Sequence, residues 1–181
     1  MNAIMNKVNE MRIYVADLAA YNNGMLSGNW INLPCDDIWE EVQKVLDDGT
    51  NARQIENVYD GYNSEEWAIH DYELPFKIEE HSNLDKINEF AKKFNELDAS
   101  DIKKISYLID YQGSSISEAL NQYENVNMYE DTSYLDLAEI LIDESWNVPE
   151  HLQNYIDYSK FARELEYEYA QIDNDLFFNQ Y

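Results

Sequence analysis

Three stretches in the first third of the chain have the side-chain pattern of half-buried β-strands. Met11–Leu18 and Gly28–Leu33 place aliphatic and aromatic residues among polar ones, and Trp67–Tyr72 repeats that pattern further along. Pro75 follows the third stretch and is expected to end it, because proline cannot donate to a sheet ladder. Together with one helix, these strands predict a small ββαβ domain over residues 1–76.

The segments that connect these strands have different patterns. Ala20–Leu26 is rich in turn residues and is predicted to be a loop that turns at Asn23-Gly24. In Asp36–Asp47 apolar residues recur at helical spacing, which predicts a helix that Gly49 should end. Asn51–Ser64 is polar, and we expect no strand there.

Residues 83–122 keep a helical period and predict a bundle of three helices. Apolar residues recur every three or four positions in the first two predicted helices, from Leu84 and from Ile102 onward. Ser115 and Glu118 have the spacing of a capping box, which predicts the start of a third, short helix. This pattern predicts a helical domain over residues 77–123.

The last part of the chain, residues 124–181, mixes both periods and is predicted to be an α+β domain. The fold class expected for the whole chain is therefore α+β, as a series of three small domains. The elements predicted for this last part are a strand at Asn125–Tyr129, a helix at Asp131–Ser145 capped by Asp131 or Thr132, a helical turn after Pro149, a helix at Lys160–Tyr167 capped by Ser159, and a hairpin of Ala170–Ile172 with Leu176–Phe178.

The charge of the chain changes this picture more than any motif. There are 37 acidic and 12 basic residues among 181, so the net charge is −25. Self-repulsion of this size costs stability. Either the chain is an extreme example of an acidic soluble protein, or the charge serves a cationic partner such as a basic protein groove. The excess argues against direct binding to nucleic acid and to anionic membranes.

The carboxylates concentrate in a window that has no basic residue, between Lys104 and Lys160. On the helix predicted there, steps of three to five residues place most acids opposite the apolar stripe of Leu135, Ala138 and Ile142. We expect this face to bind the partner diffusely, and the residues expected to contribute are Asp110, Glu118, Glu124, Glu130, Asp131, Asp136, Glu139, Asp143, Glu144 and Glu150.

Candidate chemistry is sparse. His70 and Asp71 are adjacent, but neighbours on a strand point to opposite faces, so a structural histidine at the end of a buried strand is favoured over a dyad. Cys35 is the only cysteine, which leaves a thiol enzyme using Cys35 and His70 as a minor alternative and fits a reducing cytoplasm. The Asp173-Asn174-Asp175 run lacks the EF-hand pattern. We therefore expect no cofactor, no metal site and no enzymatic activity.

Three blocks of sequence carry a specific resemblance. They read RIYVADLAAYNNGMLSGNWINLP at Arg12–Pro34, AIHDYELPF at Ala68–Phe76 and LQNYIDYSKFAREL at Leu152–Leu165. In this order they resemble the ArdA antirestriction family over nearly the whole chain. The motif residues to which the resemblance gives a structural role are His70, Asp71, Tyr72, Pro75, Tyr155, Asp157 and Tyr158.

The resemblance implies an elongated homodimer that is encoded on mobile genetic elements, with the dimer contact in the C-terminal domain. Such proteins imitate bent double-stranded DNA and occupy the DNA groove of type I restriction–modification enzymes, at the methyltransferase and specificity core. They catalyse nothing. The alternative that the residues leave open is an acidic regulatory module that masks another basic DNA-binding protein.

Overall fold

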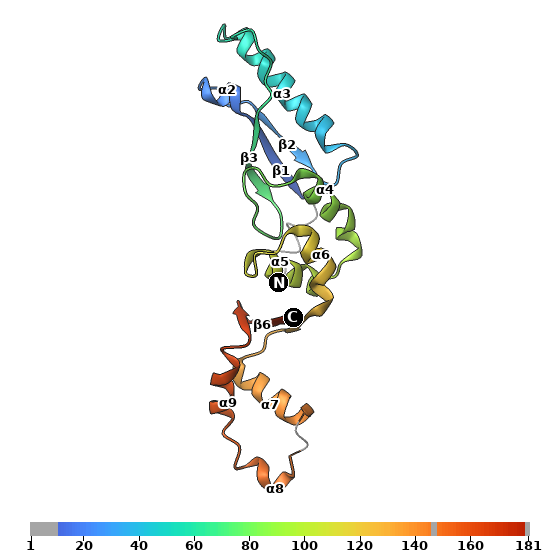
Figure 1. The fold of residues 1–181 in the computed structure, drawn as a ribbon, viewed down its shortest axis with the longest axis vertical. Helices are drawn as coiled ribbons and strands as arrows, with labels where there is room; N and C mark the ends of the chain where they lie inside the picture. The colour runs from blue at the N-terminus through green and yellow to red at the C-terminus, as the bar shows by residue number, and fades with distance from the viewer. Residues whose placement is uncertain (1–10, 146–147, 180–181) are drawn as a thin grey trace. The chain divides into compact units, whose positions relative to one another are not determined.

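A computed structural model describes residues 11–145 and 148–179 of the chain. Its contacts divide the chain into two compact units, Met1–Leu120 and Asn121–Tyr181, called here unit 1 and unit 2 (Figure 1). Within the described residues there are eight α-helices and two small antiparallel sheets, so the predicted α+β class is confirmed. No helix among these residues is both long enough and apolar enough to cross a membrane.

The sheet of unit 1 has three antiparallel strands in the order β2-β1-β3. The strands are β1 (Arg12–Asp17), β2 (Gly28–Asn32) and β3 (Trp67–Glu73), as the sequence predicts. Ile13 and Val15 of the central strand are completely buried. Helix α3 (Ile38–Ile55) packs against β1 and β2. The residues of α3 that are buried by this packing include Ile38, Val42, Val45 and Leu46.

Two predictions for the connections in unit 1 are wrong. Part of the predicted loop is a short helix, α2 (Leu18–Asn22), because the Asp17 carboxylate caps it by accepting a hydrogen bond from the Ala20 N–H at 2.9 Å. The expected turn that follows is present, and Gly24 has the positive φ of 76° that such a turn requires.

The second wrong prediction is the end of the first long helix. Helix α3 continues through Gly49 and ends only at Ile55. Gly49 is buried against Asp17, and a Cβ at this position would overlap the Asp17 Oδ2 atom. The glycine is therefore explained by a close approach rather than by a helix end. The polar segment after α3 has no strand, as predicted.

The middle of the chain is helical as expected, and it packs on the first sheet domain. Its helices are α4 (Leu84–Lys93), the 3₁₀ turn η1 (Phe94–Glu96), α5 (Ala99–Asp110) and α6 (Ile116–Gln122). The Asn88 side chain accepts a hydrogen bond from the Cys35 N–H at 3.0 Å and donates one to the Cys35 carbonyl at 2.9 Å. Through such contacts, unit 1 combines residues of the first two predicted domains. The division at residue 76 stays a prediction.

Unit 2 has a second antiparallel sheet with the strand order β4-β6-β5. Residues from its strands and helices form one small core of Leu137, Ala138, Ala162, Leu165 and Leu176. The predicted strand and terminal hairpin are confirmed. The elements of unit 2 are the 3₁₀ turn η2 (Tyr123–Asn125), β4 (Val126–Tyr129), α7 (Tyr134–Ser145), α8 (Glu150–Gln153), α9 (Tyr158–Leu165), β5 (Ala170–Ile172) and β6 (Asp175–Asn179).

Both helix starts predicted for this unit are displaced. Helix α7 starts at Tyr134, and Ser133 caps it instead of Asp131 or Thr132. Asp131 is held elsewhere, since its N–H donates to the Asp175 carboxylate at 3.0 Å. Helix α9 starts at Tyr158, and Asp157 caps it instead of Ser159, accepting from the Lys160 N–H at 2.9 Å.

Candidate partner-binding surface

Helix α7 separates a buried apolar face from an exposed acidic face. Leu137, Ala138 and Ile142 are buried, with at most 2% of their surface exposed. The exposed acids on the same helix lie at positions that a 3.6-residue period places on the opposite side. These residues, called here the α7 acidic face, are Asp136, Glu139, Asp143 and Glu144. The apolar stripe predicted from the sequence includes Leu135, but Leu135 is 44% exposed and Leu137 takes its place in the core.

The first acid of this face also starts the helix. The Asp136 carboxylate accepts hydrogen bonds from the Ser133 hydroxyl at 2.6 Å and from the Ser133 N–H at 3.2 Å. In return the Asp136 N–H donates to the Ser133 hydroxyl, which completes a reciprocal capping arrangement. These bonds, chiefly the one from the hydroxyl, lower the pKa of Asp136 from its ordinary value. The carboxylate therefore keeps its charge well below neutral pH.

Two other predicted contributors have local structural partners. Asp110, at the end of α5, accepts a hydrogen bond from the Lys77 N–H at 2.8 Å. Glu118 forms the predicted capping box, accepting from the Ser115 hydroxyl at 2.7 Å and from its N–H at 2.9 Å. The hydroxyl bond is the main cause that lowers the pKa of Glu118. Both carboxylates help to fold unit 1, whatever they do at its surface.

The remaining predicted contributors are found in unit 2. Glu124 in η2, and Glu130 and Asp131 in the turn between β4 and α7, have exposed side chains. Asp131 adopts a left-handed backbone conformation, with φ of 47°. Glu150 begins α8, and its side chain lies outside the described residues. The described members of the predicted set thus include seven exposed carboxylates within unit 2.

The two units differ in how far their charge is neutralised. Unit 1 has 23 acidic and 10 basic residues, whereas unit 2 has 14 acidic and only 2 basic ones. All ion pairs identified among the described residues join side chains of unit 1, for example Lys44 with Glu40 and Glu41. The two basic residues of unit 2, Lys160 and Arg163, are exposed on α9. The excess negative charge per residue is therefore roughly twice as large in unit 2 as in unit 1.

Unit 1 also has exposed acids that the sequence analysis did not single out. Asp36 and Asp37 precede α3, and Glu40, Asp47 and Asp48 are exposed along it. Asp37 caps the helix by accepting from the N–H groups of the two residues after Ile38. These acids lie outside the window without basic residues, and a count of acids in and next to each predicted helix would have found them.

The strand motif around His70 is buried at Ala68 and Ile69 and exposed at His70 and Asp71. Val15 pairs with Ile69 and Tyr14 with Asp71, so His70 is an extra residue in β3 and the alternation of faces is interrupted there. His70 and Asp71 are both exposed, whereas Ala68 and Ile69 just before them are buried, and the structural role expected for His70 stays a prediction. The His70 ring packs edge-on against Tyr21, with centroids 5.1 Å apart.

The other motif residues lie at the ends of elements. Tyr72 is half-buried, and the Pro75 carbonyl accepts a hydrogen bond from the Ser106 hydroxyl at 3.0 Å, which links the end of the β3 segment to α5. In the third block, Asp157 caps α9 and Tyr158 is its half-buried first residue. Tyr155 is 85% exposed, which is unusual for so large an aromatic side chain.

Cys35 and His70, the pair of the minor thiol-enzyme alternative, are each in contact with another residue. Cys35 is held by Asn88, and burial is the main cause that raises the pKa of its thiol, which disfavours the reactive thiolate. His70 is in contact with Tyr21 instead. Among these residues no group of three or more His, Cys, Asp or Glu could hold a metal ion.

Comparison with known proteins gives one answer. No curated protein matches the chain. The family model described as "Antirestriction protein (ArdA)" matches residues 13–178, which is nearly all of the sequence and includes the three motif blocks except Arg12. The chain therefore belongs to the ArdA family of antirestriction proteins.

Proposed function

We propose that this antirestriction protein inhibits type I restriction–modification enzymes by occupying the groove that binds their DNA. The observation that carries the proposal is the α7 acidic face, which lies opposite the buried stripe of a unit with 14 acids and 2 bases. Lysine and arginine side chains that line a DNA groove would meet carboxylates in place of phosphates. The partner region is the methyltransferase and specificity core.

The amount of charge is suited to a long DNA-binding groove. A homodimer would have a net charge of twice −25. Duplex DNA has one negative charge per about 1.7 Å of axis, so this charge corresponds to about 25 base pairs and roughly 85 Å of duplex. An elongated dimer of small domains, joined through the C-terminal domain, would spread its carboxylates over such a length. We propose that arrangement for this chain.

The mechanism is competition, and its energy is distributed over many contacts. Counterions released from both surfaces favour association, so inhibition should weaken as salt rises. Contacts to phosphate positions carry no base information, so inhibition should not depend on the recognition sequence of the enzyme. The ten predicted contributors act as a set within which single changes have small effects. No catalytic step and no cofactor is involved.

A displacement experiment tests the proposal. A fluorescent duplex bound to a purified type I methyltransferase–specificity core should be released by the protein at low salt, and less efficiently as salt is added. Failure to compete at low salt would overturn the proposal. Competition at an unrelated basic DNA-binding protein, without any at the methyltransferase, would favour the alternative of an acidic module with another target.

A further inference from the structure

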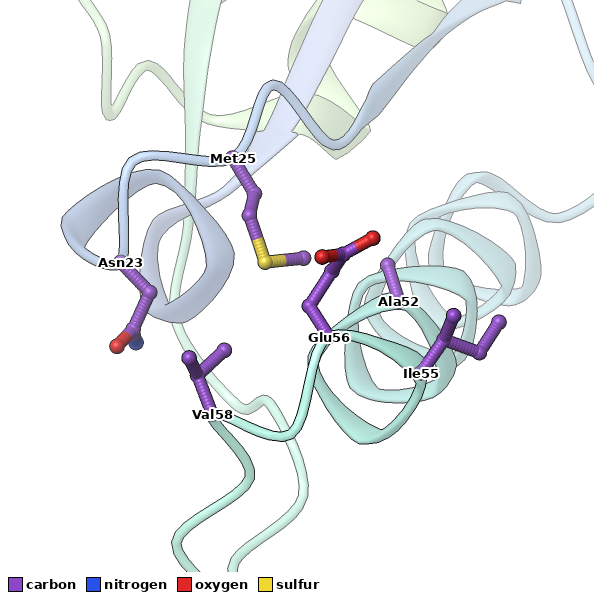
Figure 2. A pocket seen from close by; sticks show the side chains of 6 residues that line it. All are labelled: Asn23, Met25, Ala52, Ile55, Glu56 and Val58. Carbon is purple, nitrogen blue, oxygen red and sulfur yellow. The ribbon is translucent and has the colours of Figure 1, made fainter.

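A shallow hollow lies where the end of α3 meets the connection between α2 and β2. Its volume is about 480 Å³, within the range of small ligand sites. Figure 2 shows Met25 reaching across it toward Glu56, with Val58 below and Ile55 on the opposite side. The lining residues are Asn23, Met25, Ala52, Ile55, Glu56 and Val58.

The walls of the hollow are apolar and exposed. Ile55 is 75% exposed and Val58 is 40% exposed, although the chain as a whole is strongly polar with a mean hydropathy of −0.63. Leu26, next to Met25 in sequence, is 91% exposed. Apolar side chains that gather at one exposed place, rimmed by polar residues, are typical of contact sites. Such walls do not resemble a phosphate backbone, so charge mimicry alone does not explain them.

Glu56 is the one charged residue in the lining, and its position is unfavourable for folding. It is the C-cap of α3, where the negative end of the helix dipole disfavours a carboxylate. No described side chain pairs with its carboxylate, which is exposed. The nearest cation along the helix, Arg53, donates instead to the Tyr62 carbonyl at 2.8 Å and to Ser64. A positive group from outside would relieve this arrangement.

We propose that this hollow binds the side chain of one lysine or arginine that projects from the basic partner. The methylene stem would lie against Met25, Ile55 and Val58, and the charged head would pair with Glu56. Lysine and arginine have both parts, an apolar stem and a cationic end, so they match the chemistry of the hollow. The inference rests on the proposed function for the identity of the partner, because that function requires a groove rich in these residues.

This contact would differ in kind from the diffuse contacts of the acidic surface. An exposed pair of charges is weakened by salt, whereas burial of a methylene stem is not. The hollow would therefore supply a part of the affinity that persists at high salt. It would also set the position of the protein along the groove of its partner, which evenly spread carboxylates cannot do.

Substitution of an apolar wall separates the two contributions, since it leaves the net charge unchanged. Ile55→Asn combined with Val58→Asn should raise the concentration needed to displace DNA from the methyltransferase by about tenfold. The matched control is Leu152→Asn, which removes a 45% exposed leucine of α8 outside the hollow and should change that concentration by less than about threefold. Equal effects of the two variants would overturn the inference. Unchanged melting curves establish that both variants are folded.

A second experiment needs no restriction enzyme. In protein labelled with ¹³C in the methionine methyl groups, N-acetylarginine amide should shift the Met25 signal and leave that of Met128, in β4, unchanged. Guanidinium alone, which lacks the stem, should shift it less. The response should be weaker in Glu56→Gln, while Glu65→Gln, an exposed acid of unit 1 outside the hollow, should respond as the unaltered chain does. Equal shifts of the Met25 and Met128 signals would overturn the inference.

The two experiments fail in different ways. If the unaltered protein does not displace DNA, the proposed function is wrong, and the Met25 signal alone decides whether the hollow binds a cationic side chain. If the protein displaces DNA but the double Asn variant and Leu152→Asn are equivalent, the proposed function stands and the hollow has no part in it.

Discussion

Gly49 of helix α3 lies directly against the buried carboxylate of Asp17, 32 positions earlier in the chain. The same carboxylate caps α2, so one side chain sets both the start of a short helix and how closely a long helix approaches it. We expect Gly49→Ala to destabilise the protein by about 1–3 kcal/mol through overpacking. In a solvent-exposed helix the same substitution would stabilise by about 1 kcal/mol, because alanine has the higher helix propensity. Urea unfolding measures the difference.

Asn51→Ala is the control for that substitution, since Asn51 is exposed two residues further along α3. It should leave the free energy of unfolding within about 0.5 kcal/mol. A gain in stability for Gly49→Ala would contradict the prediction, because it would mean that the close approach to Asp17 does not limit the side chain at position 49.

Arg53 organises the irregular segment that follows α3. It is 2% exposed and donates hydrogen bonds to Asp60, to the Tyr62 carbonyl and to Ser64. Arg53→Met should cost about 2–4 kcal/mol of unfolding free energy, because the part-buried Tyr62 carbonyl and the buried Ser64 hydroxyl lose their donor. Hydrogen exchange should also become faster in residues 56–66.

Lys44→Met is the matched control for Arg53→Met, because it removes a cation of the same helix that pairs only at the surface, with Glu40 and Glu41. Its cost in unfolding free energy should be much smaller than that of Arg53→Met, because solvent screens an exposed ion pair. Similar losses for the two variants would contradict the role given to Arg53.

The cap of α7 should make stability depend on pH. The pKa of Asp136 is lowered in the folded state, from 3.8, so its contribution is present above that value and is lost as pH falls through the folded pKa. Asp136→Asn should therefore destabilise unit 2 at neutral pH and converge with the unaltered protein in acid. Thermal melting at several pH values between about 7 and 3 tests this.

Asp143→Asn is the control for the pH dependence, since it removes one charge from the same helix, where no cap is involved. It should destabilise the protein less than Asp136→Asn at neutral pH, or stabilise it by relieving repulsion. Identical pH profiles for the two variants would show that the capping bonds contribute nothing.

If binding is distributed over many carboxylates, the ability to displace DNA should depend on how many of them remain. Asp143→Asn alone should weaken DNA displacement by less than about fivefold, because one exposed charge is worth under about 1 kcal/mol. Neutralising the eight predicted contributors of unit 2 together should weaken it by at least about a hundredfold at low salt. Circular dichroism would confirm that the multiple variant folds. A loss from Asp143→Asn as large as that from all eight would contradict distributed binding.

Local signals in the sequence located most elements, and a contact between distant residues, Gly49 with Asp17, accounts for the misplaced end of α3. The Ser115–Glu118 box and the acids opposite Ala138 and Ile142 follow from spacing alone. Ser133 and Asp136 have the same spacing as that box, so the cap of α7 could also be predicted from local sequence.

The candidate surface was predictable in part for the same reason. Helical period places acids on a face, but it does not reveal which carboxylates fold the chain, as Asp110 does by binding the Lys77 N–H. The hollow at Glu56 could not be found from sequence, because Met25 and Ile55 come together only through the packing of α3 on the sheet.

The opposed faces of α7 separate two kinds of change that selection can act on. Leu137, Ala138 and Ile142 hold the helix in the core of unit 2, while Glu139, Asp143 and Glu144 share none of those contacts. Substitutions can add, remove or shift negative charge on one side of the helix without refolding the other. A lineage that meets new restriction enzymes can therefore revise its electrostatic pattern quickly on an unchanged scaffold.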